Sequence, residues 1–432
     1  MRYATRRGAL PGAIALVLLP LLSQQAGRAA PQAGGTCEDC HSYMSERSQR
    51  AVKEWKDGIH ASVGVGCADC HGGDPKATSM DASMSKAAGF IGTPKRSAIP
   101  QLCARCHADP VRMRPYNLPT SQYDQYLTSV HGKRLRQGDT RVAVCTDCHG
   151  IHDIRRKNDV ESSVYKTNIA DTCARCHSDA KHMQPYGIPT DQHEQYLRSV
   201  HGQKLVKERD LAAPSCADCH GTHGATPPGV TEVSEVCGRC HTLLEQLYSK
   251  SPHRAAVQEH GVPRCVDCHQ NHEIAMPTDE KLVSKGLGGC GSCHDEQSRQ
   301  FAVAKELHTA ITGVQRDQDR VRAELQRVAR LHEDIADGEA ALANADTSLK
   351  EARANVHSVS VKAIGSQIEN ARLAVGKARD VASEGFQRSY WRRTNVALAA
   401  FVFLSISGLL FVKWGALHRR WRLRLAREEE EE

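Results

Sequence analysis

The sequence predicts a mainly α-helical protein with extensive loops, almost no sheet, a long helical stalk and one C-terminal transmembrane helix. Three observations support this prediction. All eighteen cysteines stand in one short repeated pattern, which we expect to lie on short helices joined by long loops. The region from Asp295 to Tyr390 contains neither proline nor cysteine and is rich in helix-forming residues. The run from Val396 to Val412 carries no charged residue.

The cysteine pattern is Cys-x-x-Cys-His, the attachment sequence for c-type haem. Two thiols add to the vinyl groups of one porphyrin, and the adjacent histidine gives its imidazole to the iron. Complete use of cysteine predicts nine covalent haems, each with a proximal histidine. The nine copies are Cys37, Cys40 and His41; Cys67, Cys70 and His71; Cys103, Cys106 and His107; Cys145, Cys148 and His149; Cys173, Cys176 and His177; Cys216, Cys219 and His220; Cys237, Cys240 and His241; Cys265, Cys268 and His269; and Cys290, Cys293 and His294.

Other uses of paired cysteines fit the pattern poorly. A structural zinc ion takes four ligands, usually from two such pairs, and nine pairs is an odd number. A disulfide framework does not suit cysteines that each lie three residues from their nearest partner. A redox-active Cys-x-x-Cys normally occurs once, in a βαβ unit. The pattern therefore favours haem over zinc, disulfides or thiol redox chemistry.

Composition indicates how such a chain fills its interior. The 258 residues from Cys37 to His294 provide about 29 residues per haem, and aromatic residues make up 5% of the chain. We expect the haems to form the core, with the polypeptide wrapped around them. The formal charge of +7 falls when the N-terminal arginines are removed, and the haem propionates make the loaded protein negative. Nucleic acid is therefore not an expected partner.

The haem region repeats in pairs of motifs, near residues 37–74, 103–154, 173–225 and 237–274, with the ninth motif unpaired. An aromatic residue stands five positions before a histidine in every pair, and another histidine follows the second motif by three positions in three pairs. We expect these seven histidines to be distal ligands: His60, His131, His201 and His253 in the first group, and His152, His223 and His272 in the second.

Seven distal ligands leave two irons unassigned, and by position these are the irons of His71 and His294. His260 and His308 are candidates to fill them, with Met80 and Met84 less favoured, and an open iron is the alternative. His182 and His193 are interpreted as surface residues, because the sister copy has Arg112 and Tyr123 at the same positions.

Bis-histidine ligation closes the iron to substrates and keeps its potential low, which suits electron transfer. The region from Cys37 to His294 resembles the multihaem c-type cytochromes with doubled CxxCH motifs and Tyr-x-x-Ser-x-His ligands. The resemblance implies electron transport between quinol oxidoreductases, soluble cytochromes and terminal reductases. Some relatives with similar cores reduce nitrite, hydroxylamine or sulfur oxyanions.

The two ends of the chain predict its location. Residues 1–30 have the charged start, short apolar run and small residues of a secretory signal peptide, and the haem domain follows at 31–296. A transmembrane helix is expected at 394–416 and a cytoplasmic tail at 417–432. More arginines follow this helix than precede it, which places the haem domain on the periplasmic side of the inner membrane.

Residues 297–390 are expected to form a long helical stalk or a hairpin. Apolar residues recur every seven positions, which predicts packing against another helix in the same chain or in a second subunit: Val314, Val321, Val328, Ile335, Leu342, Leu349 and Val356. A solvated single helix is the alternative. A hairpin, turning within Gly338–Ser348 or Ser358–Ser366, would return the haems to the bilayer, whereas one straight helix would hold them about 140 Å away.

The sequence therefore predicts a membrane-anchored nine-haem cytochrome that carries electrons in respiration, from a quinol-linked or other donor to another redox protein. A quinone-reactive membrane subunit is an expected partner, and an oligomer formed through a coiled-coil stalk is an alternative arrangement. Two other functions remain open: a reductase of a nitrogen or sulfur oxyanion at one open haem, and a structural haem subunit of a respiratory complex. Electron carriage is favoured over catalysis, and no catalytic residue is assigned.

Overall fold

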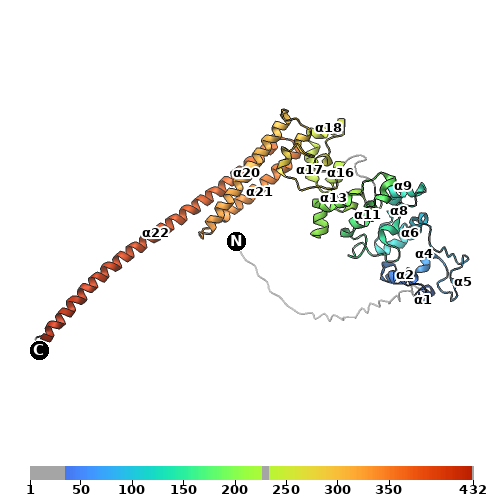
Figure 1. Ribbon diagram of the computed structural model, residues 1–432, viewed down its shortest axis with the longest axis horizontal. Helices are drawn as coiled ribbons and strands as arrows, with labels where there is room; N and C mark the ends of the chain where they lie inside the picture. Colours follow the sequence, from blue (N-terminus) through green and yellow to red (C-terminus); the bar gives the residue numbers. More distant parts are fainter. Residues whose placement is uncertain (1–34, 226–232, 431–432) are drawn as a thin grey trace, which may run out of the picture. The chain divides into compact units, whose positions relative to one another are not determined.

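Helices and loops make up the whole of the described chain (Figure 1), which a computed structural model covers over residues 35–225 and 233–430. No strand occurs in these two ranges, so the predicted mainly α-helical fold is confirmed. The predicted signal peptide at 1–30 lies outside the described residues. The chain divides into two units: the first comprises residues up to Leu118 together with Ala143–Ser162, and the second comprises Pro119–Val142 and Ser163–Glu432.

Short helices carry the haem motifs in both units. The helices of the first unit are α1 (Gly35–His41), α2 (Glu46–Asp57), α3 (Ile59–Ser62), α4 (Cys67–His71), α5 (Met80–Ser83), η1 (Arg96–Ala98), α6 (Ile99–His107), α7 (Pro110–Met113), η2 (Arg114–Tyr116) and α10 (Cys145–His149). Those of the second unit, before the stalk, are α8 (Gln122–Thr128), α9 (Val130–Arg136), η3 (Lys166–Asn168), α11 (Ile169–His177), α12 (Ala180–Met183), η4 (Gln184–Tyr186), α13 (Gln192–Arg198), α14 (Val200–Gly202), η5 (Gln203–Lys207), α15 (Cys216–His220), α16 (Val233–Gly238), α17 (Thr242–Ser249), α18 (Pro252–His260), α19 (Cys265–His269), η6 (Asp279–Leu282) and η7 (Cys290–Ser292).

The second motif of each pair forms a five-residue helix whose start is fixed by an aspartate inside the motif. In α15, the Asp218 carboxylate accepts a hydrogen bond of 2.7 Å from the backbone N–H of Ser215, the residue before the helix. Asp69, Asp147 and Asp267 make the same contact in α4, α10 and α19. Each aspartate satisfies a backbone donor that the helix itself leaves unpaired. The cysteine-to-histidine segment is thereby held helical.

A glycine ends three of these four helices. Gly72 has φ +69°, a left-handed conformation that costs glycine little, and a Cβ there would lie 2.0 Å from the carbonyl oxygen of Gly89. Gly150 and Gly221 end α10 and α15 in the same way. The chain can therefore turn sharply directly after each proximal histidine.

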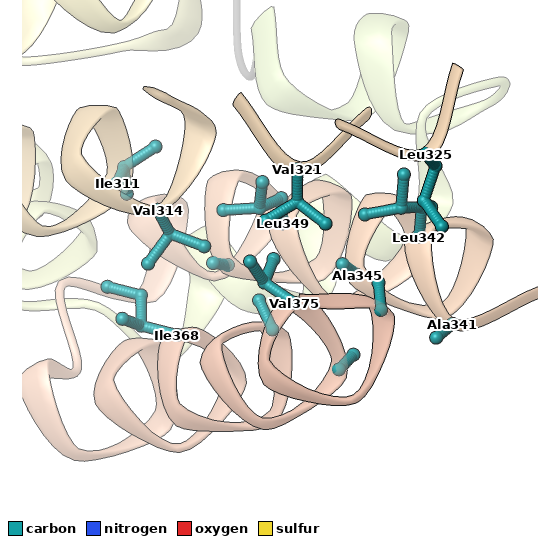
Figure 2. Packing of buried hydrophobic residues seen from close by; sticks show 14 of the residues in the cluster. Ile311, Val314, Val321, Leu325, Ala341, Leu342, Ala345, Leu349, Ile368 and Val375 are labelled. Atoms are coloured by element: carbon teal, nitrogen blue, oxygen red, sulfur yellow. The ribbon is translucent and has the colours of Figure 1, made fainter. Parts of the chain in front are cut away.

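Three long helices follow the haem motifs: α20 (Arg299–Ala329), α21 (Ala336–Asn355) and α22 (Val361–Glu430). They share an apolar core (Figure 2), in which Ile311, Val321, Leu349 and Ile364 are at most 1% exposed. The heptad residues of the sequence lie in this core or pack against it. The stripe predicted from the sequence is therefore the face along which the three helices pack.

One of the two turns predicted for the stalk differs from the structure, and the other overlaps its predicted segment. The first turn spans residues 330–335, where His332 has φ +61°, and Gly338–Ser348 lies inside α21. Gly338 is used for close packing instead, because a Cβ there would lie 2.6 Å from a methyl carbon of Leu325. The second turn, η8 (Val356–Ser358) with Val359 at φ +54°, overlaps the predicted segment Ser358–Ser366.

Three helices, unlike a two-helix hairpin, lead the chain away from the haem motifs of the second unit. The η8 end of the stalk meets these motifs, since Arg353 pairs with Asp279 at 2.8 Å. The other turn lies along the later part of α22, where Arg392 pairs with Glu333 at 2.9 Å. The stalk is therefore neither the single straight helix nor the two-helix hairpin considered from the sequence.

The last part of α22 has no protein cover. Its large apolar side chains between Val396 and Leu425 are exposed, among them Phe403 at 70% and Leu409 at 72%. The helix contains an eighteen-residue window of mean hydropathy 2.3 and is the one helix in the described chain that is long and apolar enough to cross a membrane. Exposed apolar side chains on all faces are what a lipid-embedded helix presents.

Candidate haem-ligand sites

Seven motif histidines face a second histidine across a nearly constant gap. The ring centroids are 6.2 Å apart for His107 and His60, 6.3 Å for His71 and His152, 6.3 Å for His177 and His131, 6.2 Å for His241 and His201, 6.0 Å for His220 and His272, 6.2 Å for His294 and His253, and 6.0 Å for His269 and His357.

This gap has the width that one metal ion between two imidazoles requires. A ligating nitrogen lies about 2.0 Å from a transition metal and the ring centre about 1.1 Å farther, so two rings sharing one iron have centres about 6.2 Å apart. Rings in direct contact would lie much closer together. The planes of the pairs meet at angles from 7° to 61°, so stacking does not set the spacing. The residues therefore fit a haem iron held from both sides.

The protonation state of the paired rings also suits a metal. Burial lowers the pKa of His60, His107, His201 and His253 below the ordinary value for histidine. A neutral imidazole keeps the nitrogen lone pair that a metal needs. His71 is oriented further by its Nδ1, which lies 2.8 Å from the carbonyl oxygen of Gly92 and leaves Nε2 directed at the gap.

The pairs follow a regular order along the repeats. Each histidine that follows an aromatic residue reaches forward to the first motif of the next copy, as His60 reaches His107 and His201 reaches His241. A histidine three residues after a second motif reaches back to the second motif of the previous copy, as His272 reaches His220. Neighbouring copies therefore exchange histidines that fit the role of distal ligands.

This exchange gives a histidine partner to both motif histidines that the sequence left without one. His71 faces His152 and His294 faces His253, although the sequence left both without a partner. His41 has no histidine ring opposite it in the described part of its unit, because no copy precedes the first one. His149 lies in the first unit and His223 in the second, and their ligand roles stay predictions.

The aromatic residue five positions before His60, His201 or His253 holds the segment that carries this histidine against the second motif of its own copy. The Tyr196 hydroxyl donates to the carbonyl of Pro214 at 2.9 Å, and Tyr248 donates to Pro263 at 2.8 Å. The indole N–H of Trp55 donates to the Val65 carbonyl at 3.0 Å. In every case the acceptor lies two residues before the first cysteine of that motif. One side-chain hydrogen bond thus ties a distal ligand to the next haem motif.

A serine in the Tyr-x-x-Ser-x-His segment shapes the turn before the ligand. Ser199 is 1% exposed; its hydroxyl donates to the Tyr196 carbonyl at 2.6 Å and accepts from the Gly202 N–H at 3.0 Å. It therefore caps α14, the helix that presents His201. Ser129 makes the same two contacts before His131.

Backbone hydrogen bonds join each copy to the next at its ligands. The N–H of Val200, beside His201, donates to the carbonyl of Ile274 at 2.9 Å, two residues past His272. In the first unit, the N–H of Ile59 donates to the carbonyl of Ile154 at 2.8 Å, two residues past His152. The two exchanged ligands of neighbouring copies are thus positioned by one shared contact.

The cysteines of successive motifs lie close together. The thiols of Cys173 and Cys216 are hydrogen-bonded, and this contact raises the pKa of Cys173. The same contact joins Cys103 to Cys145 and Cys237 to Cys265. None of the eighteen thiols, all of which lie in the described ranges, forms a disulfide. Haem motifs that follow one another in the sequence therefore also lie next to one another within each unit.

Other histidines occupy places that do not suit a ligand. His308 lies 3.1 Å from a carboxylate oxygen of Glu280, and the His260 side chain is 71% exposed beside Glu259. Neither faces a motif histidine, so their candidacy for the irons of His71 and His294 is not supported. The Nε2 atom of His193 lies 3.0 Å from a carboxylate oxygen of Asp171.

Sequence reasoning missed one residue of the set, His357. It lies in the stalk turn η8, outside every haem motif, and it faces His269. One signal was available: the repeats end after His269, so no later copy supplies a ligand that reaches back to it.

Comparisons with known proteins agree with this arrangement. The family described as Cytochrome c3 matches residues 59–178, and the one described as Doubled CXXCH motif matches residues 207–246. The Multiheme cytochrome MtrA of Shewanella baltica (strain OS185) is 26% identical over 165 residues, which cover 35% of this chain and 42% of that protein. The match thus spans less than half the length of this curated relative. No solved structure matches the chain.

Repeated haem-attachment motifs, histidine pairs spaced for iron and these matches have one common explanation. The chain is a multihaem c-type cytochrome with a C-terminal apolar helix that serves as a membrane anchor.

Proposed function

We propose that this protein is a nine-haem electron carrier of a respiratory chain, exported by its signal peptide and anchored with its haems outside the cytoplasm. The spacing of the seven histidine pairs carries the proposal. An iron with imidazoles on both sides has no free position for a substrate, so it exchanges electrons and does not bind reactants. Haem iron supplies one-electron chemistry, and the polypeptide sets ligands, burial and spacing.

The spatial order of the motifs supports electron transfer from each haem to the next one along the sequence. Within the second unit, the thiol of Cys173 contacts Cys216, and Cys237 contacts Cys265. Cys219 is also close enough to Cys240 to interact with it electrostatically, and Cys268 is close enough to Cys290. Successive haem edges attached at these thiols would therefore be close. Electron transfer falls steeply with distance, so close packing is what a conducting series needs.

The stalk constrains the electron donor. From Val361 to Val396, α22 rises about 53 Å at 1.5 Å per residue. A quinol inside the bilayer would thus lie far from the haems of the second unit. The donor we propose is a redox partner that itself projects from the membrane, such as the extramembrane part of a quinone-reactive subunit.

Ligation and haem count test the proposal together. Intact mass of the purified holoprotein should exceed that of the processed chain by nine haems, and electron paramagnetic resonance should find at least seven low-spin irons. A majority of high-spin irons would contradict the electron-carrier function. A mass increase of five haems or fewer would contradict the haem count.

A second candidate function rests on His41. Its motif has no histidine ring opposite it in the described part of the first unit, and Cys40 beside it is exposed. A five-coordinate iron there would be open to nitrite, hydroxylamine or a sulfur oxyanion. Mixing the reduced protein with each compound tests this function. Rapid reoxidation that carbon monoxide inhibits would favour a reductase, whereas inertness toward all three would leave electron carriage alone.

A further inference from the structure

His357 lies opposite His269 at the end of the repeats, and no repeat supplies it. The ring centroids are 6.0 Å apart and the planes meet at 13°. In the six other pairs, in which both histidines come from the repeats, the ring centroids are 6.0 to 6.3 Å apart. The distance between His269 and His357 falls within this range. We propose that Nε2 of His357 is the distal ligand of the iron bound by Cys265, Cys268 and His269, so that the stalk completes the last haem pair.

The orientation of the His357 ring fits this role. Its Nδ1 lies 3.0 Å from the carbonyl oxygen of Ala354, one turn earlier in the chain. A carbonyl only accepts hydrogen bonds, so Nδ1 carries the proton and Nε2 keeps its lone pair. A hydrogen bond from the second ring nitrogen is the usual way in which a metal-ligating histidine is held.

The turn that carries His357 is fixed at both ends. Ser358 donates its hydroxyl to the Asn355 carbonyl at 2.7 Å, and Val359 adopts the left-handed conformation that ends η8. The η8 turn packs on α17, the helix that leads into His253. His357 is therefore held on a rigid turn between two long helices, which limits the movement of the ring.

A salt bridge anchors this end of the stalk to the haem segment. The Arg353 guanidinium makes two parallel hydrogen bonds to the Asp279 carboxylate, of 2.9 and 2.8 Å. Asp279 begins η6, in which Lys281 donates to the carbonyl of Cys268 at 3.0 Å. A bidentate pair fixes direction as well as distance. Arg353 is thus a positioning residue that places the stalk turn beside the motif of His269.

The end of the repeats explains why the stalk is needed. In earlier copies, the residue before the distal histidine donates its N–H to the next copy, as Val200 does to Ile274. The last copy has Pro252 at this position, and proline has no N–H to donate. No fifth copy follows to receive such a bond or to send a ligand back to His269. The η8 turn supplies the ligand instead.

The proposal rests on the bis-histidine haems of the proposed function and adds a consequence. If an iron joins His269 to His357, the haem domain and the membrane-anchored stalk are linked through a coordination bond in addition to their packing. Loading of this haem would then stabilise the junction between them.

Replacement of His357 in the full-length, haem-loaded protein tests the assignment. His357→Ala should create one additional haem per chain that binds carbon monoxide when reduced, and added imidazole should return it to the low-spin state. His308→Ala is the matched control, since His308 is another stalk histidine beside the haem segment but contacts Glu280. The control should bind no additional carbon monoxide.

His357→Met covers the case in which the alanine variant does not fold. Methionine can still ligate the iron, so this variant should stay low-spin while one haem shifts to higher potential. Unchanged carbon monoxide binding in a folded alanine variant, or unchanged potentials in the methionine variant, would overturn the proposal. Neither result would change the number of low-spin haems in the wild type. The proposed function is therefore tested separately from the assignment of His357.

Discussion

The hydroxyl of Tyr196 donates to the carbonyl oxygen of Pro214 at 2.9 Å and so joins the helix before a distal ligand to the segment that enters the next haem motif. Tyr196 is 9% exposed, and its ring packs with Leu205 and Ala213. The contact recurs with Tyr248 and, through an indole, with Trp55, so three copies of the repeat share it.

Tyr196→Phe should therefore destabilise the protein without removing a ligand. The phenylalanine keeps the ring packing but leaves the Pro214 carbonyl without its donor, at a cost of about 1–2 kcal/mol. Thermal unfolding of the haem-loaded variant should occur a few degrees below that of the wild type, with an unchanged haem spectrum. Tyr43→Phe is the control, since Tyr43 is 88% exposed. Equal melting of both variants would show that the hydrogen bond contributes nothing.

The exchange of ligands between copies gives a second prediction. His60→Ala should create one high-spin haem, and that haem should be the one attached through Cys103 and Cys106, beside His107. Adding Cys103→Ala and Cys106→Ala to the variant should abolish the new carbon monoxide binding, because the opened haem is then absent. Adding Cys37→Ala and Cys40→Ala should leave the new binding in place. The reverse result would mean that His60 serves the haem of its own copy.

The sequence indicated most of the histidines that the structure pairs, but not which motif histidine each one faces. The fixed place of His60 or His272 in each copy was visible in the repeat, whereas the iron that each one faces depends on how neighbouring copies pack. The assumption that a copy keeps its own ligands left His71 and His294 empty. Exchange moves the shortfall to the ends of the series, where His41 faces no histidine in the described part of its unit and His269 faces the stalk.

The stalk shows the same limit. Its heptad pattern predicted the buried face, because side-chain burial follows directly from helical periodicity. The number of helices did not follow from it. Gly338 was interpreted as a turn residue, but it lies inside α21 and packs against Leu325 of α20. The turn at His332 contains no glycine or proline. A glycine that allows two helices to approach closely and a glycine that ends a helix look alike in the sequence.

Alanines in the stalk set the distance between its helices, which leads to a third prediction. Ala345 is fully buried in the core shared by the three helices, and Ala343 on the same helix is exposed. Ala345→Leu should force the helices apart and cost about 1–3 kcal/mol, while Ala343→Leu should be nearly neutral. Thermal unfolding followed by circular dichroism measures both. A leucine tolerated equally at the two positions would contradict the close packing of α21.

A charged contact predicts dependence on pH. The Tyr186 hydroxyl donates to the Asp139 carboxylate at 2.8 Å, and this bond, together with the N–H of Arg141, holds the pKa of Asp139 below its ordinary value of 3.8. A depressed pKa favours the charged form in the folded state. The stabilisation is therefore present above the ordinary pKa and is lost as the pH falls below it.

Asp139→Asn should accordingly lower the melting temperature slightly at pH 7, and the difference from the wild type should shrink as the pH falls below about 4. Asparagine keeps an acceptor for the tyrosine hydroxyl, so the comparison isolates the charge. The exposed Asp124 supplies the control variant, Asp124→Asn. A difference that stays constant from pH 7 to pH 3 would exclude the carboxylate as its source.

The last prediction concerns the orientation of the membrane helix. Arg419, Arg420, Arg422 and Arg424 follow the apolar segment of α22 within a few turns, whereas Arg388 and Arg392 before it are partly engaged with Glu333 of the stalk. The side with more free arginine should remain in the cytoplasm. Trypsin added to spheroplasts should therefore release the haem-bearing part and leave the tail intact, while permeabilised cells should lose both. A tail that is cleaved in intact spheroplasts would reverse the topology, and the haems would then lie on the side of the membrane where c-type attachment does not take place.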